Sequence, residues 1–238
     1  MGPDMVDRRP EGEMRAGGAD GEAALGSGFV LLWVRELATR IRDQRDYLTQ
    51  LDAAIGDADH GINMDRGLAA AMEKVGGMEA ESPGAILEAV GTALIFSVGG
   101  AAGPLYGTGF RGLGKALGER RRFDPEDLLM ALRAGLEAIQ NLGAASQGDK
   151  TIVDAFAPAI GAFERGLRAG EDLATSTARA REAAEDGMRA TVPMQARKGR
   201  ASYLGPRSVG HQDPGATSTA LLFSALERAA GRGATERP

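Results

Sequence analysis

The chain has 238 residues, of which 43% are hydrophobic and 26% charged, and its formal net charge is −5. This length allows one large domain with a substantial core, and the acidic balance argues against a general nucleic-acid surface. Cysteine is absent, which excludes disulfide and thiolate chemistry. No apolar run approaches the roughly 20 residues that span a bilayer. We therefore expect a cytoplasmic globular protein that binds neither nucleic acid nor membrane.

Helical spacing of apolar residues begins at Phe29. The preceding stretch, residues 1–28, is rich in Gly, Asp, Glu and Arg and has almost nothing to bury, so we expect a disordered tail. From Phe29 the pattern predicts one helix that continues to Leu51 and delivers Asp52 to a loop. A second helix is expected from about Ile62 to a stop at Gly76-Gly77.

The rest of the chain also has helical patterns, without sustained strand alternation. Ser82-Pro83 and Asp124-Pro125 each combine an N-cap residue with a proline at the first helical position. Further helices are expected over residues 85–98 (apolar nearly all round, and so buried), 125–143, about 148–168 (kinked at Pro158), 171–189 and 217–230. The fold class is therefore all-α, with one domain over residues 29–232 and a disordered C-terminus, 233–238.

The segment Leu51–Gly67, LDAAIGDADHGINMDRG, places three aspartates within eight residues, and a histidine and an asparagine follow directly. Glycines on both sides of the aspartates indicate a tight loop between two helices. In such a loop the three carboxylates converge and repel one another unless they share cations, and Mg²⁺ prefers such oxygen ligands. The residues are Asp52, Asp57, Asp59, His60 and Asn63.

A glycine-rich stretch, GGAAGPLYGTG, occupies Gly99–Gly109. Such glycines cost about 1 kcal/mol each inside a helix relative to alanine, so they indicate close packing against another helix or close approach to a phosphate. Both alternatives stay open from the glycines alone. The nearby matches to dinucleotide-binding and P-loop patterns are discounted, because no strand precedes them and Ala116 lacks the hydroxyl that would bind Mg²⁺.

A long irregular segment, Met194–Gly215, contains several cations beside His211 and Asp213. Long irregular loops within compact domains are usually functional or disordered. Phosphoryl transfer requires metal bridging, close backbone approach and neutralisation of phosphate charge, and the three unusual segments offer these together. The sequence therefore predicts a nucleotide or polyphosphate site in helix-connecting loops. The cations are Arg197, Lys198, Arg200 and Arg207.

Five separated motifs resemble the nucleotide-binding L subunit, or L domain, of dihydroxyacetone kinases, in order from Phe29 to about Ala230. They read LDAAIGDADHGINMDRG, GGAAGPLYGTG, GDKTIVDAFAP, MQARKGRASYLG and SVGHQDPGATS. The resemblance implies an antiparallel barrel of about eight amphipathic helices with the nucleotide in loops at one rim. It also implies two Mg²⁺ ions, held by Asp52, Asp57 and Asp59, that bridge the phosphates of ADP or ATP.

The same resemblance implies a set of nucleotide-binding residues. One departure is Ala102, where the family often has a serine whose hydroxyl would meet a phosphate, so contact there is expected to be weaker or through the backbone. The implied residues are His60, Gly61, Ile62, Asn63, Gly100, Ala101, Ala102, Gly148, Ile152, Arg200, Asp213, Pro214 and Gly215.

In this family a separate K subunit holds the substrate, so the chain is expected to act as half of a phosphotransferase. The favoured hypothesis is a dihydroxyacetone kinase subunit whose ADP is rephosphorylated in place by a phosphotransferase-system protein, the M subunit. The alternative is an L subunit of an ATP-dependent kinase for another ketose such as erythrulose. A fatty-acid kinase subunit is disfavoured, since that family usually reads DGDTG in the acidic loop. Contact with a transcription regulator and a homodimeric state stay open.

Overall fold

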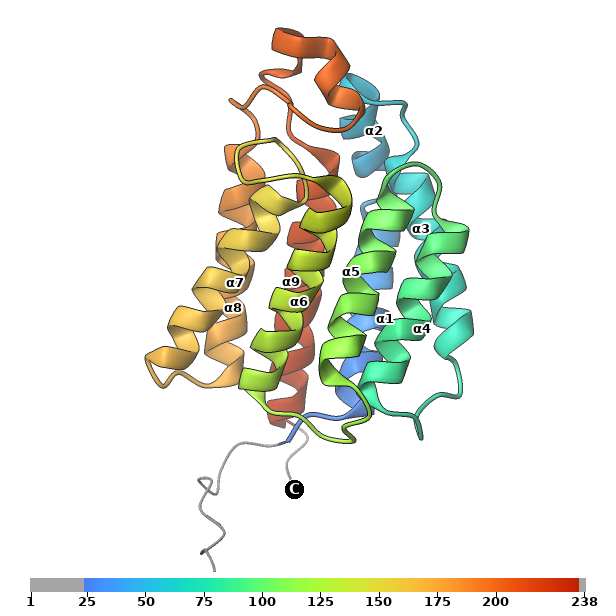
Figure 1. Cartoon of the computed structure of the whole chain (residues 1–238), viewed down its shortest axis with the longest axis vertical. Coiled ribbons are helices and arrows are strands. Elements are labelled where there is room, and N and C mark those ends of the chain that lie inside the picture. Colours follow the sequence, from blue (N-terminus) through green and yellow to red (C-terminus); the bar gives the residue numbers. More distant parts are fainter. Residues whose placement is uncertain (1–23, 236–238) are drawn as a thin grey trace, which may run out of the picture.

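The computed structural model describes residues 24–235, and the regular elements in this range are all helical (Figure 1). An isolated antiparallel bridge pairs Leu25 with Phe123. In the same range, no helix is long and apolar enough to cross a membrane. The elements are α1 (Ser27–Asp43), α2 (Arg45–Ile55), α3 (His60–Val75), α4 (Pro83–Ser97), α5 (Ala102–Leu117), α6 (Pro125–Gly143), α7 (Val153–Arg168), α8 (Leu173–Ala190), the 3-10 helix η1 (Arg200–Ser208) and α9 (Pro214–Thr235).

Eight of these helices pack side by side in a closed ring. The order around the ring is α1, α3, α4, α5, α6, α7, α8 and α9, and α9 packs against α1 to close it. Successive helices of the ring run in opposite directions, while α2 and η1 lie across one end (Figure 1). The predicted all-α, antiparallel barrel of about eight helices is confirmed.

The centre of the ring is filled by large side chains with almost no solvent exposure. The indole Nε1 of Trp33 in α1 donates a hydrogen bond to the carbonyl of Leu222 in α9 at 3.0 Å, and its ring lies 6.2 Å from that of Phe110. Phe156 and Phe223 meet edge to face at 5.1 Å. Burial of each such side chain stabilises the fold by about 1.5–3 kcal/mol, so this core holds all eight ring helices together.

The helix caps follow the sequence closely at two positions. The Ser82 hydroxyl accepts a hydrogen bond from the Ala85 amide at 3.2 Å, and Pro83 opens α4. Asp124 forms a reciprocal capping box with Asp127 before Pro125. Both bonds satisfy amides that have no partner within the helix, which fixes where α4 and α6 begin.

Two expectations about helix shape were wrong. The helix predicted to run from Phe29 to Leu51 is broken at Gln44, which lets α2 leave the ring and cover its end. No glycine or proline marks this break, so tertiary packing decides it. Helix α4 is not buried all round either, because the side chain of Phe96 is 84% exposed.

The predicted tail, residues 1–28, lies mostly outside the described residues. Its last part is ordered, because Leu25 pairs with Phe123 and α1 begins at Ser27. At the other end α9 extends to Thr235, beyond the predicted boundary at residue 232. Residues 236–238 lie outside the described range.

The glycines of α5 allow its backbone to approach α4. A Cβ atom on Gly91 of α4 would lie 2.5 Å from the carbonyl oxygen of Gly107, and one on Gly107 would lie 2.6 Å from that of Gly91. Gly84 and Gly114 form a similar pair near the other end of the same two helices. A Cβ atom on Gly84 would lie 2.7 Å from the Gly114 carbonyl oxygen, and one on Gly114 would lie 2.6 Å from that of Gly84. Close helix packing therefore explains the glycines inside α5, whereas Gly99 and Gly100 precede the helix.

We predict that Gly91→Ala lowers the free energy of unfolding by about 1–3 kcal/mol, because the added methyl group forces two backbones apart. Gly231→Ala is the matched control, since a Cβ there meets nothing within 4 Å. That substitution should leave stability unchanged or raise it by up to about 1 kcal/mol. Urea unfolding measures both, and equal stability of the two variants would contradict the close-packing explanation.

Candidate functional site

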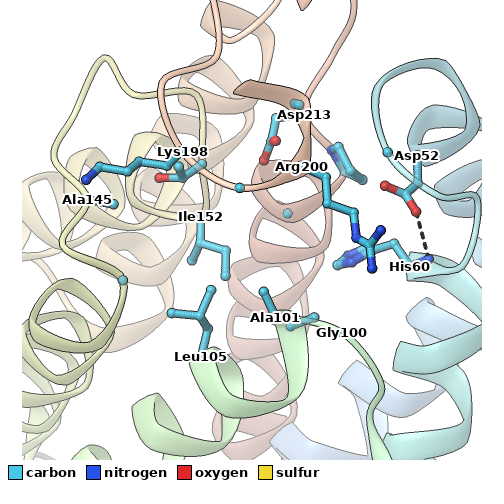
Figure 2. A pocket seen from close by; sticks show the side chains of 18 of the residues that line it. Asp52, His60, Gly100, Ala101, Leu105, Ala145, Ile152, Lys198, Arg200 and Asp213 are labelled. Carbon is cyan, nitrogen blue, oxygen red and sulfur yellow. Dashed lines mark hydrogen bonds between the residues drawn. The ribbon is translucent and has the colours of Figure 1, made fainter. Parts of the chain in front are cut away.

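Four helix N-termini meet around one cavity at the covered end of the ring. The cavity has a volume of about 490 Å³, and its walls include the first turns of α3, α5, α7 and α9 (Figure 2). The positive end of the helix dipole makes each N-terminus favourable for an anion. Four of them around one cavity indicate a site for a strongly negative group.

Asp52 connects the acidic loop to the start of α3. Its side chain is only 8% exposed, and one carboxylate oxygen accepts hydrogen bonds from the amides of Asp59 at 2.9 Å and His60 at 3.2 Å (Figure 2). The N-cap residue Asp59 makes no side-chain cap bond of its own. Asp52 therefore caps α3 from the last turn of α2 and fixes the loop between them.

The three aspartates converge as the sequence predicted. Ala58 between Asp57 and Asp59 has a φ of +62°, a left-handed conformation that non-glycine residues rarely adopt. One carboxylate oxygen from each of Asp52, Asp57 and Asp59 lies within 4.8 Å of the others. This donor set of oxygens fits a hard divalent cation such as Mg²⁺.

The glycine loop before α5 forms the next wall of the cavity. Gly99, Gly100, Ala101 and Ala102 all line it, and Gly100 has a φ of +67°. Beneath this loop the Asn63 side chain fills the space beside Gly99, where an added Cβ would lie 2.9 Å from its Nδ2. Loop and acidic segment are thus packed against each other.

The basic segment supplies the third wall. A guanidinium nitrogen of Arg200 lies 3.0 Å from a carboxylate oxygen of Asp57, and Lys198 also lines the cavity (Figure 2). Arg197 and Arg207 are exposed and do not line it. His211 is exposed too and lies outside the cavity lining, unlike His60.

A buried chain of hydrogen bonds holds the His60 ring. Its Nε2 lies 2.9 Å from the Ser218 hydroxyl, which is 2.7 Å from the Tyr106 hydroxyl, and Tyr106 in turn is 2.9 Å from Thr219. Burial lowers the pKa of His60, so the imidazole is neutral at pH 7. These hydrogen bonds connect α3, α5 and α9 behind the cavity.

One side of the cavity is apolar. It combines the start of α5, the end of α6 and the residues before α7, and it suits the flat, weakly polar part of a ligand whose anionic part faces the helix N-termini. The apolar residues are Leu105, Ile139, Leu142, Ala145, Ile152 and Val153.

Twelve of the sixteen predicted site residues line the cavity and four do not. Gly61 packs against α2, where a Cβ would lie 2.0 Å from the Arg45 carbonyl oxygen, and Ile62 is 51% exposed. Asn63 supports the glycine loop from below. Gly148 donates its amide to Asp154 in a turn before α7. Those that line it are Asp52, Asp57, Asp59, His60, Gly100, Ala101, Ala102, Ile152, Arg200, Asp213, Pro214 and Gly215.

Sequence reasoning missed Lys150 and, apart from Ile152, the apolar wall. Leu105 and Ile139 have the spacing of ordinary core residues, so no signal separates them from the core. Lys150 was part of a recognised motif, GDKTIVDAFAP, but was given no role. It is 1% exposed and lines the cavity.

Asp213 is buried beside the cavity at the start of α9. Its carboxylate accepts a hydrogen bond from the Ala216 amide at 2.6 Å, as an N-cap does. Burial raises its pKa to about 7, while the Ala216 hydrogen bond and the positive charge of Lys150 act in the opposite direction. The folded protein therefore releases the Asp213 proton only as the pH rises through about 7.

Comparison with known proteins agrees with this geometry. A family model described as the DAK2 domain matches residues 54–228. The chain belongs to the DAK2 domain family. It is 39% identical over 201 residues to the ADP-binding subunit DhaL of the PEP-dependent dihydroxyacetone kinase of Escherichia coli, covering 84% of this chain and 96% of that subunit.

Two longer proteins also match this DAK2 protein. The D-erythrulose kinase of Mycolicibacterium smegmatis is 34% identical over 205 residues, which cover 85% of this chain but 35% of that kinase. The crystal structure of the dihydroxyacetone kinase from C. freundii with AMP-PNP and Mg²⁺ superposes with a TM-score of 0.61 at 22% identity, covering 93% of this chain and 38% of that one. This structural likeness shows the fold.

We predict that Asp213→Asn removes one contribution to the pH dependence of stability. Between about pH 4 and pH 7 the folded protein keeps the Asp213 proton that the unfolded chain releases, so this group's contribution to stability falls as pH rises. The melting temperature of Asp213→Asn relative to the original protein should therefore increase from pH 4 to pH 8. Asp186→Asn changes an exposed aspartate and is the control. If the difference in melting temperature between Asp213→Asn and the original protein is the same at every pH, the prediction is wrong.

Proposed function

We propose that this DAK2 protein is the ADP- or ATP-binding subunit of a dihydroxyacetone kinase. In this proposal it transfers a phosphoryl group from Mg-bound nucleotide to dihydroxyacetone held by a separate K subunit. The observation that carries it is the cavity itself, where three convergent carboxylates, four helix N-termini and an apolar wall surround one space. The identity of 39% to an ADP-binding subunit over nearly its full length supports the same conclusion.

Asp52, Asp57 and Asp59 are the residues that would hold Mg²⁺, and we propose two ions. When bound, Mg²⁺ offsets phosphate charge and polarises the phosphoryl group that is transferred. The metal would also offset the negative charge of the three carboxylates, of which Asp57 forms an ion pair with Arg200. The positive charges of two Mg²⁺ ions, Lys198 and Arg200 would nearly balance the negative charges of the three carboxylates and a diphosphate.

The chain's own residues bind and orient the nucleotide. We assign the phosphates to the amides around Gly100–Ala102 and the neutral His60 ring, and the base to the wall near Leu105 and Ile152. Ala102 has no hydroxyl, so its contact with a phosphate is through its backbone amide. The amides of Gly61 and Ile62 lie in the first turn of α3, where backbone contact with a phosphate needs no side chain.

The proposed reaction needs two partners. The substrate hydroxyl, held by the K subunit, would attack the terminal phosphorus of ATP. The bond from that phosphorus to the ADP oxygen would break, and the hydroxyl proton would pass to water. ADP then regains a phosphoryl group from a phosphotransferase-system M subunit without leaving the cavity. We place this assembly in the cytoplasm; neither a homodimer nor contact with a transcription regulator is required for it.

Dihydroxyacetone phosphorylation in a reconstituted mixture tests the proposal. The chain with a K subunit should form product when PEP and phosphotransferase-system proteins are supplied, and neither the chain alone nor the mixture without it should do so. Asp57→Asn should lower the rate at least about 100-fold through loss of a metal ligand. Asp46→Asn is the matched control, because that exposed residue of α2 lies outside the cavity lining and pairs with neighbouring Arg45.

Three other outcomes are informative. Product formation with free ATP and without the phosphotransferase-system proteins would replace the retained-ADP hypothesis with an ATP-dependent one. A strong preference for erythrulose over dihydroxyacetone would favour the alternative ketose kinase. Full activity of Asp57→Asn would contradict the metal role of the acidic loop.

A further inference from the structure

Lys150 is a buried cation without an assigned role in the nucleotide site. Its side chain is 1% exposed, and its backbone has a φ of +63°, which lysine rarely adopts. Desolvation lowers its pKa, so burial of this ammonium group works against its charge. Among residues 24–235, no salt bridge joins it to a carboxylate, although Asp213 lies near enough to attract it. A lysine at such a position needs compensating contacts.

Those contacts are three backbone carbonyls on one segment. The Lys150 ammonium group donates hydrogen bonds to the carbonyl oxygens of Met194 at 3.1 Å, Ser208 at 2.6 Å and His211 at 2.5 Å. An ammonium group has three protons, so the three carbonyls use its full donor capacity. Met194 begins the irregular segment, and Ser208 and His211 lie near its end. One side chain therefore ties both ends of the segment together.

The turn that carries Lys150 is itself held firmly. Both carboxylate oxygens of buried Asp154 accept backbone hydrogen bonds, from Gly148 at 2.5 Å and from Thr151 at 2.7 Å. The carbonyl of Asp149 accepts a further bond from the Arg197 amide at 3.1 Å. The turn thus contacts the segment both beside Lys198 and at its two ends.

Other contacts also define the shape of the segment, among them the 3-10 helix η1 and a hydrogen bond from the Gly210 amide to the Val192 carbonyl at 2.8 Å. The apolar anchor of the segment is a small cluster of Ile55, Ala196, Ala201 and Leu204, separate from the core of the barrel. A second support is the buried Ser208 hydroxyl, which accepts from the Ala196 amide and donates to the Gly205 carbonyl. The segment also presents Lys198 and Arg200 at the cavity (Figure 2). A guanidinium nitrogen of Arg200 pairs there with the Asp57 carboxylate. The conformation of the segment therefore decides where these two cations lie.

We propose that Lys150 is a positioning residue, whose three hydrogen bonds hold residues 194–211 in the shape that places Arg200 beside the acidic loop. The effect on nucleotide binding rests on the proposed function, whereas the effect on the segment does not. Lysine suits the position because its compact ammonium group can reach three convergent carbonyls, whereas the planar guanidinium of arginine cannot point its protons in the same way.

Limited trypsin digestion tests the effect on the segment. Lys150→Met keeps the length of the side chain and removes its donors, so cleavage after Arg197, Lys198 and Arg200 should become at least about tenfold faster. Lys74→Met changes an exposed lysine on α3 and is the matched control. In this variant the segment should be cleaved at the same rate as in the original protein. Lys150→Gly removes the ammonium group while fitting the left-handed backbone, and it should behave as Lys150→Met does. Unchanged cleavage in both Lys150 variants would overturn the proposal.

A double-mutant cycle tests the effect on the site. Calorimetry with Mg-ADP should show that Arg200→Gln and Lys150→Met each weaken binding about tenfold or more, and that the double variant binds no worse than Lys150→Met alone. Such coupling is expected only if Lys150 acts through Arg200, whereas a general loss of stability would give additive effects. Additive weakening, or Mg-ADP affinity of Lys150→Met equal to that of the original protein, would overturn the proposal.

Two remaining outcomes separate the proposed function from the proposed role of Lys150. If the original protein binds no Mg-ADP, the proposed function fails, while trypsin digestion still tests Lys150. If both Lys150 variants lose the helical barrel by circular dichroism, the proposal is wrong, because a residue that only fastens this segment should leave the barrel folded. Wild-type melting behaviour of the barrel with a freely cleaved segment is the expected result.

Discussion

The closed ring of eight antiparallel helices is the constraint on which the site depends. In such a ring every second helix begins at the same end, so α3, α5, α7 and α9 all direct the positive ends of their helix dipoles there (Figure 1). Glycine pairs between α4 and α5 bring two of the ring helices close enough to share backbone contacts. The result is an end of the barrel that favours anions before any charged side chain is added.

Three connecting segments convert that end into a cavity with both signs of charge. The acidic loop brings carboxylates that would repel a phosphate, and the basic segment brings Arg200 against Asp57 and Lys198 to another part of the cavity wall. Asp52 has two roles here, because its carboxylate caps α3 and also belongs to the acidic cluster. A substitution at Asp52 would therefore disturb the loop geometry as well as the charge, which makes Asp57 the cleaner position for separating the two.

The sequence predicted what depends on local chemistry. Ser82-Pro83 and Asp124-Pro125 mark helix starts because their side chains satisfy free amides, and the spacing of Asp52, Asp57 and Asp59 indicates convergence in a tight loop. It could not predict the break at Gln44, where no glycine or proline interrupts the helical pattern. Nor could it separate Leu105 and Ile139 from the core, since a cavity wall and a core have the same apolar spacing. Lys150 was hidden because its partners are backbone carbonyls some 44 to 61 residues away.

The central claim is that the acidic loop, the glycine loop and the basic segment together form one metal-nucleotide site. Crystals grown with ADP and Mn²⁺ in place of Mg²⁺ test it most directly, because Mn²⁺ gives an anomalous signal that locates the metal without any assumption about its ligands. The account predicts anomalous peaks beside the carboxylates of Asp52, Asp57 and Asp59, with the nucleotide between Ala101 and Arg200. Peaks elsewhere, or ADP bound away from this cavity, would contradict it.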